Sequence, residues 1–292
     1  MTAGPIVTGI DGSEQALRAV DWAAREAVLR GSPLRIVSAV ELPPRMAIER
    51  PGRSGPGTVA DTQRLDRDRA LAAAAQRAAA VAPDLLVDVD TLTGPPARAV
   101  AEAGSGASML VVGSRGGGAF TALILGSVSR YVAAHASCPV VVVREETTAA
   151  HRQVGVGIGD PAGSSAALAF AFEEAALREA SLLAVQAWDT PGGDVARARM
   201  ALATPGAPAL EEEAARQLQA VLSDWQGKYP DVQVSQDFVY AHPGRALVGL
   251  SARADLVVLG RRRMDGILPG PGAVRHAVLN HAHGPVVIVP TP

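Results

Sequence analysis

The sequence has very little cysteine, lysine and aromatic residue, and each scarcity excludes a class of chemistry. Cys138 is the single cysteine among 292 residues, which excludes internal disulfides and a cysteine-built metal site. Lys228 is the single lysine, and its surroundings, Gly227-Lys228-Tyr229, lack the glycine spacing and the Ser or Thr of a Walker P-loop. Aromatic residues make up 3% of the chain, so the core has to be built from Ala, Val and Leu.

The chain also lacks an excess of charge of either sign and a long apolar run. The formal net charge of -2 provides no basic field for a nucleic-acid backbone. The first residues, MTAGPIVTGIDGS, show no basic segment followed by a long apolar one, so we expect no signal peptide. No run of about 18 apolar residues occurs either. We therefore expect a cytoplasmic protein that uses neither nucleic acid nor a membrane as its partner.

An internal repeat organises what is present. Three segments of the first half align with segments of the second half at offsets of 148, 147 and 146 residues. The aligned pairs are Val7–Ala27 with Gly155–Ala175, Gly94–Gly113 with Ala241–Gly260, and Gly126–Val143 with Gly272–Val289. A repeat of this length is a whole domain. We therefore expect two tandem domains, residues 1–146 and 154–292, with the boundary in the polar stretch Arg144–Gln153.

Each copy alternates short apolar runs with amphipathic stretches. In the first copy the predicted strands are Pro5–Ile10, Leu34–Val40, Leu85–Leu92, Met109–Gly113 and Pro139–Val143. The predicted helices are Glu14–Leu29, Thr58–Val81, Pro96–Ala103 and Ser127–Ala136. Continuous apolar strands separated by helices predict a parallel sheet covered on both faces. The predicted fold class is α/β, with two tandem doubly wound domains, each a five-stranded parallel sheet with helices on both faces.

One long connection lacks periodicity. The segment Glu41–Gly57 is rich in Pro, Gly and Arg. It follows the second predicted strand and so leaves the sheet at the carboxyl edge, where ligands bind in folds of this kind. It is either a disordered connector or a lid over a site.

A glycine-rich segment follows the fourth predicted strand. Gly113 ends that strand, Gly116–Gly118 follow, and Gly126 and Ser127 open a helix. Glycines let backbone N–H groups approach an anion closely, and a helix N-terminus adds free donors and positive potential. We expect Ser127 to be the N-cap of that helix, and the hydroxyls of Ser114 and Ser127 to be available to a phosphate. Taken alone, the segment fits a phosphate site and an ordinary glycine-rich turn equally well.

The first predicted strand ends with a carboxylate at the same edge of the sheet. The residues are Gly9-Ile10-Asp11-Gly12-Ser13. On local grounds, Asp11 or Ser13 either caps the helix that follows or contributes to a ligand site.

Together these motifs resemble the universal stress protein family. The spacing Gly113-x2-Gly116-x9-Gly126-Ser127 matches that family's ATP-binding pattern, G-x2-G-x9-G-[ST], at every position. The segment Gly9–Ser13 is similar to the family's first-strand signature. The last two strands of the first copy also look like the family's, at Leu110–Gly113 and Pro139–Val143. The resemblance covers nearly the whole chain, as two tandem domains.

The resemblance implies a module that binds ATP, alone or with Mg²⁺. In ATP-binding members the adenosine lies between the ends of the first two strands and the phosphates lie on the glycine loop. This implies that Gly9 and Asp11 lie near the adenosine and that the backbone of Ala39 contacts the adenine. The residues implied around the phosphates and the ribose are Gly113, Ser114, Arg115, Gly116, Gly117, Gly118, Ala119, Gly126, Ser127 and Val128.

The final strands of the two copies are short, apolar and expected at sheet edges. Open hydrogen-bonding groups on such edges invite pairing with another strand. Universal stress proteins commonly dimerise there, so the resemblance implies an intramolecular pseudo-dimer in which Val140–Val143 pairs antiparallel with Val286–Val289. A homodimer through other surfaces is a further option.

The second copy departs from the ATP-binding motif. Gly159 stands where the first copy has Asp11, with Asp160 displaced by one position, and Ala273 stands in place of Ser127. The loop of the second copy is one residue shorter, and Arg263 replaces the glycine that would approach the ligand closely. Pro269 and Pro271 bring no N–H donors to this loop. The loop begins Gly260, Arg261, Arg262, Arg263, Met264, Asp265, and Gly272 is retained at its end. We expect a degenerate, weaker site. The alternative is that the three arginines bind an anion through their side chains.

Other candidate residues carry little chemistry. His281 and His283 have no acidic or cysteine partner at ligand spacing, so no metal site is expected. His135 and His281 occupy equivalent positions before the last strand of each copy, which indicates a structural role. Cys138, beside Pro139, is expected to be a small buried residue.

We therefore expect a nucleotide-responsive regulator of stress or dormancy physiology rather than an enzyme, with at most weak ATP hydrolysis. The physiological part follows from the resemblance alone. The alternatives are an enzyme that hydrolyses ATP or transfers an adenylyl group, and a scaffold that binds no nucleotide. Near the glycine loop there is no general base, no catalytic lysine, and no acidic group for Mg²⁺ beyond Asp11, which disfavours the enzyme.

Overall fold

The computed structural model describes residues 4–41, 59–116, 125–144, 150–159, 162–187, 207–239, 241–261 and 271–291. The chain divides into two compact units, Met1–Arg144 and Glu145–Pro292. Apart from Glu41, the predicted connector or lid at 41–57 lies outside the described residues, as do residues 145–149 of the polar stretch at the boundary between the units.

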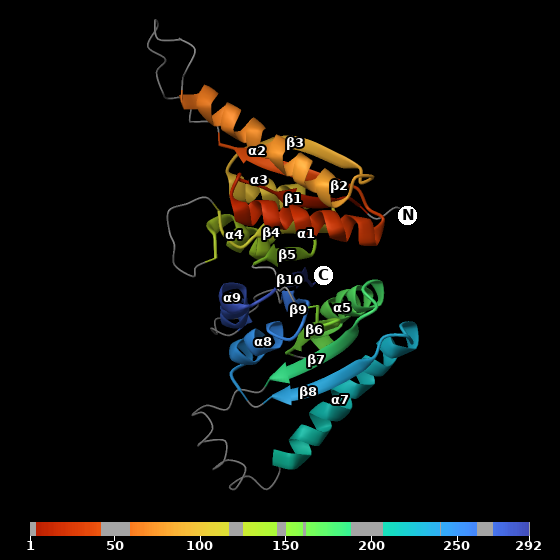
Figure 1. The fold of residues 1–292 in the computed structure, drawn as a ribbon. Helices are drawn as coiled ribbons and strands as arrows, with labels where there is room; N and C mark the ends of the chain where they lie inside the picture. Colours follow the sequence, from red (N-terminus) through yellow and green to blue (C-terminus); the bar gives the residue numbers. More distant parts are fainter. Residues whose placement is uncertain are drawn as a thin grey trace, which may run out of the picture. The chain divides into compact units, whose positions relative to one another are not determined.

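The first unit is a five-stranded parallel sheet (Figure 1). Its strands are β1 (Ile6–Gly9), β2 (Leu34–Val40), β3 (Val87–Thr93), β4 (Met109–Gly113) and β5 (Val140–Val143). Its helices are α1 (Glu14–Arg30), α2 (Val59–Val81), α3 (Pro96–Ala103) and α4 (Ser127–His135). The pairings give the order β3-β2-β1-β4-β5. Strands β4 and β5 are buried at every position and β1 at all but Gly9, as expected for continuous apolar runs.

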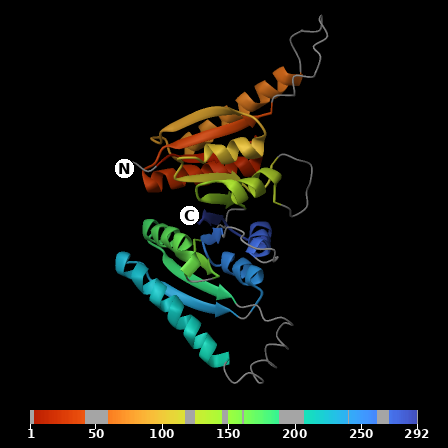
Figure 2. The same cartoon turned by 180° about the vertical axis from the view of Figure 1, so that it is seen from behind.

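Two pairs of helices cover the two faces of this sheet. Helix α1 packs against α2, and α3 packs against α4, and the two views of the molecule show the pairs on opposite sides (Figures 1 and 2). Two strand glycines show how closely the helices approach the sheet. A Cβ at Gly9 would lie 2.9 Å from a methyl group of Val100 in α3, whereas a Cβ at Gly113 would lie 2.7 Å from the carbonyl oxygen of Gln15 in α1. The predicted doubly wound α/β class is therefore confirmed.

The second unit repeats the same topology. Its strands are β6 (Gln153–Ile158), β7 (Ser181–Ala187), β8 (Val234–Val239), β9 (Leu256–Arg261) and β10 (Val286–Pro290). Its helices are α5 (Ser165–Leu177), α7 (Ala207–Lys228), α8 (Pro243–Ser251) and α9 (Pro271–His281). All pairings are parallel, in the order β8-β7-β6-β9-β10. The second sheet therefore has the same order of five strands as the first.

The repeat extends to one buried ion pair in each unit. Glu26 lies inside α1 and forms an ion pair with Arg30, with Nε and Oε1 2.6 Å apart. Glu174 of α5, which is fully buried, forms the equivalent pair with Arg178 one turn later. Because a buried carboxylate is costly without a partner, an arginine four residues further along the helix stabilises it in both copies.

Candidate functional site

The candidate site lies at the carboxyl edge of the first sheet. Strands β1 and β2 run parallel with Gly9 opposite Val37, and the N–H of Ile10 donates to the carbonyl of Val37 at 2.9 Å. Strand β1 ends at Gly9, opposite Val37 of β2. Ala39 lies two residues further along β2, near the same edge of the sheet, and is half-buried. The ends of the first two strands thus lie side by side, as the predicted placement of Gly9 and Ala39 requires.

The turn after β1 is held by two side chains. The N–H of Ser13 donates to Oδ1 of Asp11 at 3.0 Å, and Oγ of Ser13 accepts a hydrogen bond from the N–H of Ala16 at 3.2 Å. Ser13 is therefore the N-cap of α1, one of the two local alternatives that the sequence allows. Gly12 between them has a φ of 83°, a left-handed conformation that glycine adopts without strain.

Backbone hydrogen bonds close the base of the glycine loop. The N–H of Ser114 donates to the carbonyl of Val143 at 2.8 Å, and the N–H of Gly126 donates to the carbonyl of Ser114 at 2.9 Å. Ser129 adds a buried hydrogen bond from its hydroxyl to the carbonyl of Gly113, at 2.6 Å. Ser114 itself is buried, so its side chain is not on the exposed surface of the loop. The two halves of the motif are thus joined although they are twelve residues apart.

Gly116 and Asp11 meet at this edge. A Cβ at Gly116 would collide with Oδ2 of the Asp11 carboxylate. The first glycine of the loop after β4 is therefore next to the carboxylate of the loop after β1. Neither residue could be placed beside the other from local sequence alone, because 105 positions separate them along the chain. Gly116 is exposed, so its backbone is open to a ligand from solution.

The start of α4 differs from the expectation in one respect. The prediction that Ser127 is the N-cap is wrong: Ser127 is the first residue of the helix, and Gly126, with an extended ψ of 152°, occupies the cap position. Its hydrogen bond to Ser114 fixes Gly126 outside the helix. A glycine cap supplies no side-chain acceptor, so it leaves the first N–H groups of α4 without the partner that a serine cap would provide. Ser127 is exposed and Val128 is half-buried.

The described part of the predicted site therefore comprises Gly9, Asp11, Ala39, Gly113, Ser114, Arg115, Gly116, Gly126, Ser127 and Val128. Gly117, Gly118 and Ala119 lie outside the described residues.

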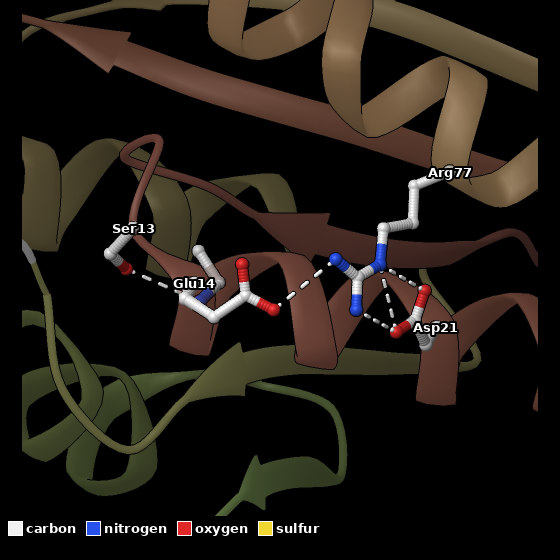
Figure 3. A network of polar contacts seen from close by, with 5 residues as sticks. Ser13, Glu14, Asp21 and Arg77 are labelled. Carbon is white, nitrogen blue, oxygen red and sulfur yellow. Dashed lines mark hydrogen bonds and ion pairs between the residues drawn. The ribbon is translucent and has the colours of Figure 1, made fainter.

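Arg77 of α2 binds two carboxylates of α1, the helix that follows the turn after β1. This contact between the two helices was not predicted from the sequence. The guanidinium of Arg77 donates from Nε to both carboxylate oxygens of Asp21, at 2.8 and 3.0 Å, and from Nη1 to Glu14 at 3.2 Å (Figure 3). The hydrogen bond to Asp21 raises the pKa of Arg77 above its ordinary value, against the opposing effect of burial. The signal in the sequence was a lone cation within the Ala-rich part of the second predicted helix.

The equivalent edge of the second unit is built differently. A short 3-10 turn, Ala162–Ser164, stands before α5, and Ser164 forms no side-chain cap hydrogen bond. A Cβ at Gly159 would meet nothing within 4 Å, and one at Gly260 would lie 3.7 Å from the Cβ of Ala167. The close approach seen at Gly113 is therefore absent at Gly260. Asp160 and the loop residues 262–270, with the arginines Arg262 and Arg263, lie outside the described residues.

The cysteine and the two histidines that precede the last strands lie in positions that suit a structural role. Cys138 is buried, as predicted. His135 and His281 are the last residues of α4 and α9, and the ring of His135 stacks on Tyr131 with the centroids 4.0 Å apart. Among the described residues, no three His, Cys, Asp or Glu side chains gather as metal ligands. No helix in the described ranges combines the length and apolar character needed to cross a bilayer.

Comparison with known proteins agrees with the repeated fold. The model of the universal stress protein family matches residues 3–144 and again 151–290, and the chain therefore belongs to the universal stress protein family. It is 34% identical over 305 residues to universal stress protein Rv2005c of Mycobacterium tuberculosis, covering 97% of this chain and 96% of that protein.

Solved structures of the family resemble the chain as well. A universal stress protein from Archaeoglobus fulgidus DSM 4304 covers 99% of both chains, with a TM-score of 0.68 and 16% identity, which shows the shared fold. A structure of the universal stress protein from Archaeoglobus fulgidus in complex with dAMP covers 49% of this chain and 98% of its own, with 27% identity and a TM-score of 0.35.

Proposed function

We propose that the first domain binds ATP, alone or with Mg²⁺, and that the protein acts as a nucleotide-responsive regulator in stress or dormancy physiology. One observation carries the proposal: the carboxylate of Asp11 lies against Gly116, at a point where any Cβ would collide. A residue without a side chain, beside a carboxylate and exposed to solution, suits the close approach of a ligand to the backbone.

The described residues fit an adenine nucleotide in chemical terms. Backbone N–H groups at Gly116 and at the glycine-capped start of α4 suit phosphate oxygens, because a helix N-terminus presents donors and positive potential. Asp11, Gly9 and Ala39 suit the nucleoside, since a carboxylate accepts hydrogen bonds from ribose hydroxyls. The carboxylate of Asp11, which lies against Gly116, could also meet Mg²⁺. The hydroxyl of Ser127 is exposed and adds a donor.

We propose that the second domain is the weaker site. It lacks the Ser13-type cap, and Gly159 stands where the first domain has Asp11. The full chain is then expected to have a single tight site for ATP. Comparable affinity of both domains would show that the substitutions in the second copy do not matter for binding.

We also propose that the two domains form an intramolecular pseudo-dimer through β5 and β10. Each of these strands is the last of its own sheet, paired to β4 and to β9 respectively. Such strands present open hydrogen-bonding groups that a partner strand would satisfy.

The deciding experiment measures retained nucleotide first and turnover second. The full chain is purified, denatured, and its released nucleotides are identified by chromatography and mass spectrometry; the stripped protein is then titrated with ATP by calorimetry. A regulator of the proposed kind retains or binds ATP and forms little product on prolonged incubation. Rapid ADP or adenylylated product would favour the enzyme alternative, and no binding at all would favour a scaffold.

A further inference from the structure

Arg67 stands at the end of the buried stripe of α2. The side chains four, seven and eleven positions further along, Leu71, Ala74 and Ala78, are all buried and form the face that packs inward. Arg67 is the next position on that stripe towards the start of the helix, and its side chain is 16% exposed. A guanidinium is therefore held where the apolar packing of α2 ends.

That end of the stripe lies at the carboxyl edge of the sheet. A Cβ at Gly12 would lie 3.2 Å from the Cβ of Ala70, so α2 passes the turn after β1 at Ala70. Arg67 is three residues nearer to the helix start, about 4.5 Å along the axis. Long side chains of a helix lean towards its N-terminus, so the guanidinium of Arg67 is expected still further beyond the turn at Gly12, past the carboxyl edge of the sheet that also carries Asp11 and Gly116.

One donor of the Arg67 guanidinium has no acceptor. Nε of Arg67 is buried and has no hydrogen-bond partner. The ion pair recorded for Arg67 joins Nη2 to Oδ1 of Asp68 at 3.7 Å, which is too long for a hydrogen bond, and Asp68 is exposed. Arg77, ten residues later, has three hydrogen bonds to Asp21 by contrast. A buried donor without an acceptor is costly, and such a group in a native structure requires an explanation.

We propose that Arg67 binds a phosphate oxygen of the nucleotide in the first domain. This inference rests on the proposed function. A guanidinium suits a phosphate because it carries a permanent charge and a planar set of donors, and a charge-assisted hydrogen bond is stronger than a neutral one. Arg67 then makes the site discriminate by phosphate charge: it strengthens the binding of ATP and ADP and leaves the binding of adenosine unchanged.

The test compares Arg67→Met with a matched control on the same helix. Methionine keeps an unbranched stem for packing and removes the charge and every donor. Arg69→Met is the control, because Arg69 is 78% exposed and forms an ion pair with Asp66 at 3.3 Å. Each stripped full-length variant is titrated by calorimetry with ATP, ADP and adenosine, and its thermal unfolding is followed without ligand.

Arg67→Met is expected to weaken ATP binding by about tenfold to a hundredfold, the range for a hydrogen bond to a charged group, and to change adenosine affinity less than about twofold. Arg69→Met is expected to bind all three ligands as the unaltered chain does. Without ligand, Arg67→Met should be at least as stable as the unaltered chain, because it removes a buried donor that has no acceptor and gives up only the long ion pair to the exposed Asp68. Arg67→Lys, which keeps the charge and loses the fork of donors, should bind ATP with intermediate affinity.

Unaltered ATP affinity in Arg67→Met would overturn the proposal. An equal loss of affinity for ATP and adenosine, or lower stability without ligand, would also overturn it, since either result assigns Arg67 a structural role. If the unaltered chain binds no nucleotide, the proposed function fails and this inference fails with it; if the unaltered chain binds ATP and Arg67→Met binds it equally well, only the inference on Arg67 fails.

Discussion

Replacing Arg77 with methionine is expected to destabilise the first domain, because it leaves the carboxylate of Asp21 without its arginine partner. Arg77 donates three hydrogen bonds to Asp21, at 2.8, 3.0 and 2.8 Å, and one to Glu14 at 3.2 Å. The Asp21 side chain is 9% exposed, whereas that of Arg77 is 37% exposed. Methionine preserves part of the packing of the arginine stem, so the substitution removes mainly the polar contacts.

The size of the effect follows from how the pair is buried. Removing one partner of a fully buried pair costs about 3–5 kcal/mol, while an exposed pair contributes roughly 0–1 kcal/mol. The Arg77–Asp21 pair lies between these limits, so we expect a loss of about 2 kcal/mol in the free energy of unfolding. In a domain of roughly 150 residues this lowers the midpoint of thermal unfolding by about 4–8 °C.

Calorimetric unfolding of the full chain is the assay, with the transition of the first domain followed separately from that of the second where the two resolve. Arg98→Met is the matched control: Arg98 forms an ion pair with Glu102 one turn along α3, and both side chains are exposed, so no measurable change in midpoint is expected. The double variant Arg77→Met, Asp21→Asn should recover part of the loss, because no charge is then stranded. Equal midpoints for Arg77→Met and Arg98→Met would refute the reasoning.

Gly116→Val should remove most ATP binding while the fold persists, because the added Cβ meets only the movable end of the Asp11 side chain. The control is Gly249→Val, at an exposed glycine where a Cβ would meet nothing within 4 Å. Unchanged ATP affinity of Gly116→Val in calorimetry would contradict the assignment of the loop to the phosphates. Ser127→Ala should cost about 0.5–1.5 kcal/mol of ATP binding for one hydrogen bond, or more if the hydroxyl meets a charged phosphate. If it binds ATP like the unaltered chain, the hydroxyl does not contact the ligand. The separated domains should self-associate in sedimentation experiments, because each then exposes the apolar last strand of its sheet. Monomeric, folded halves would count against pairing through β5 and β10.

Much of the fold could be predicted because its signals are local. The predicted bounds Leu34–Val40, Pro96–Ala103 and Met109–Gly113 are those of β2, α3 and β4. Two of these segments are apolar runs set off by turn residues, and the third begins at a proline, which favours the first position of a helix. The internal repeat added the topology, since a second copy of the same pattern predicts the same sheet.

The start of α4 shows where local signals end. Ser127 has the residue type of an N-cap, and local preference favours it there. The hydrogen bond from Gly126 to Ser114 decides otherwise, because it holds Gly126 in an extended conformation and makes it the cap. That partner is twelve residues away and comes from the end of a different element.

The sequence by itself determined the alternation of strands and helices, the duplication and the spacing of the glycine motif, because each depends on periodicity or on residue types at short range. Only the tertiary structure decided which distant groups meet. It brought Asp11 against Gly116, paired Arg77 with Asp21, and buried Nε of Arg67 without a hydrogen-bond partner. The physical reason is that a hydrogen bond or a steric contact depends on distance in space, and the parallel crossovers of this fold bring together residues that lie tens of positions apart in the chain.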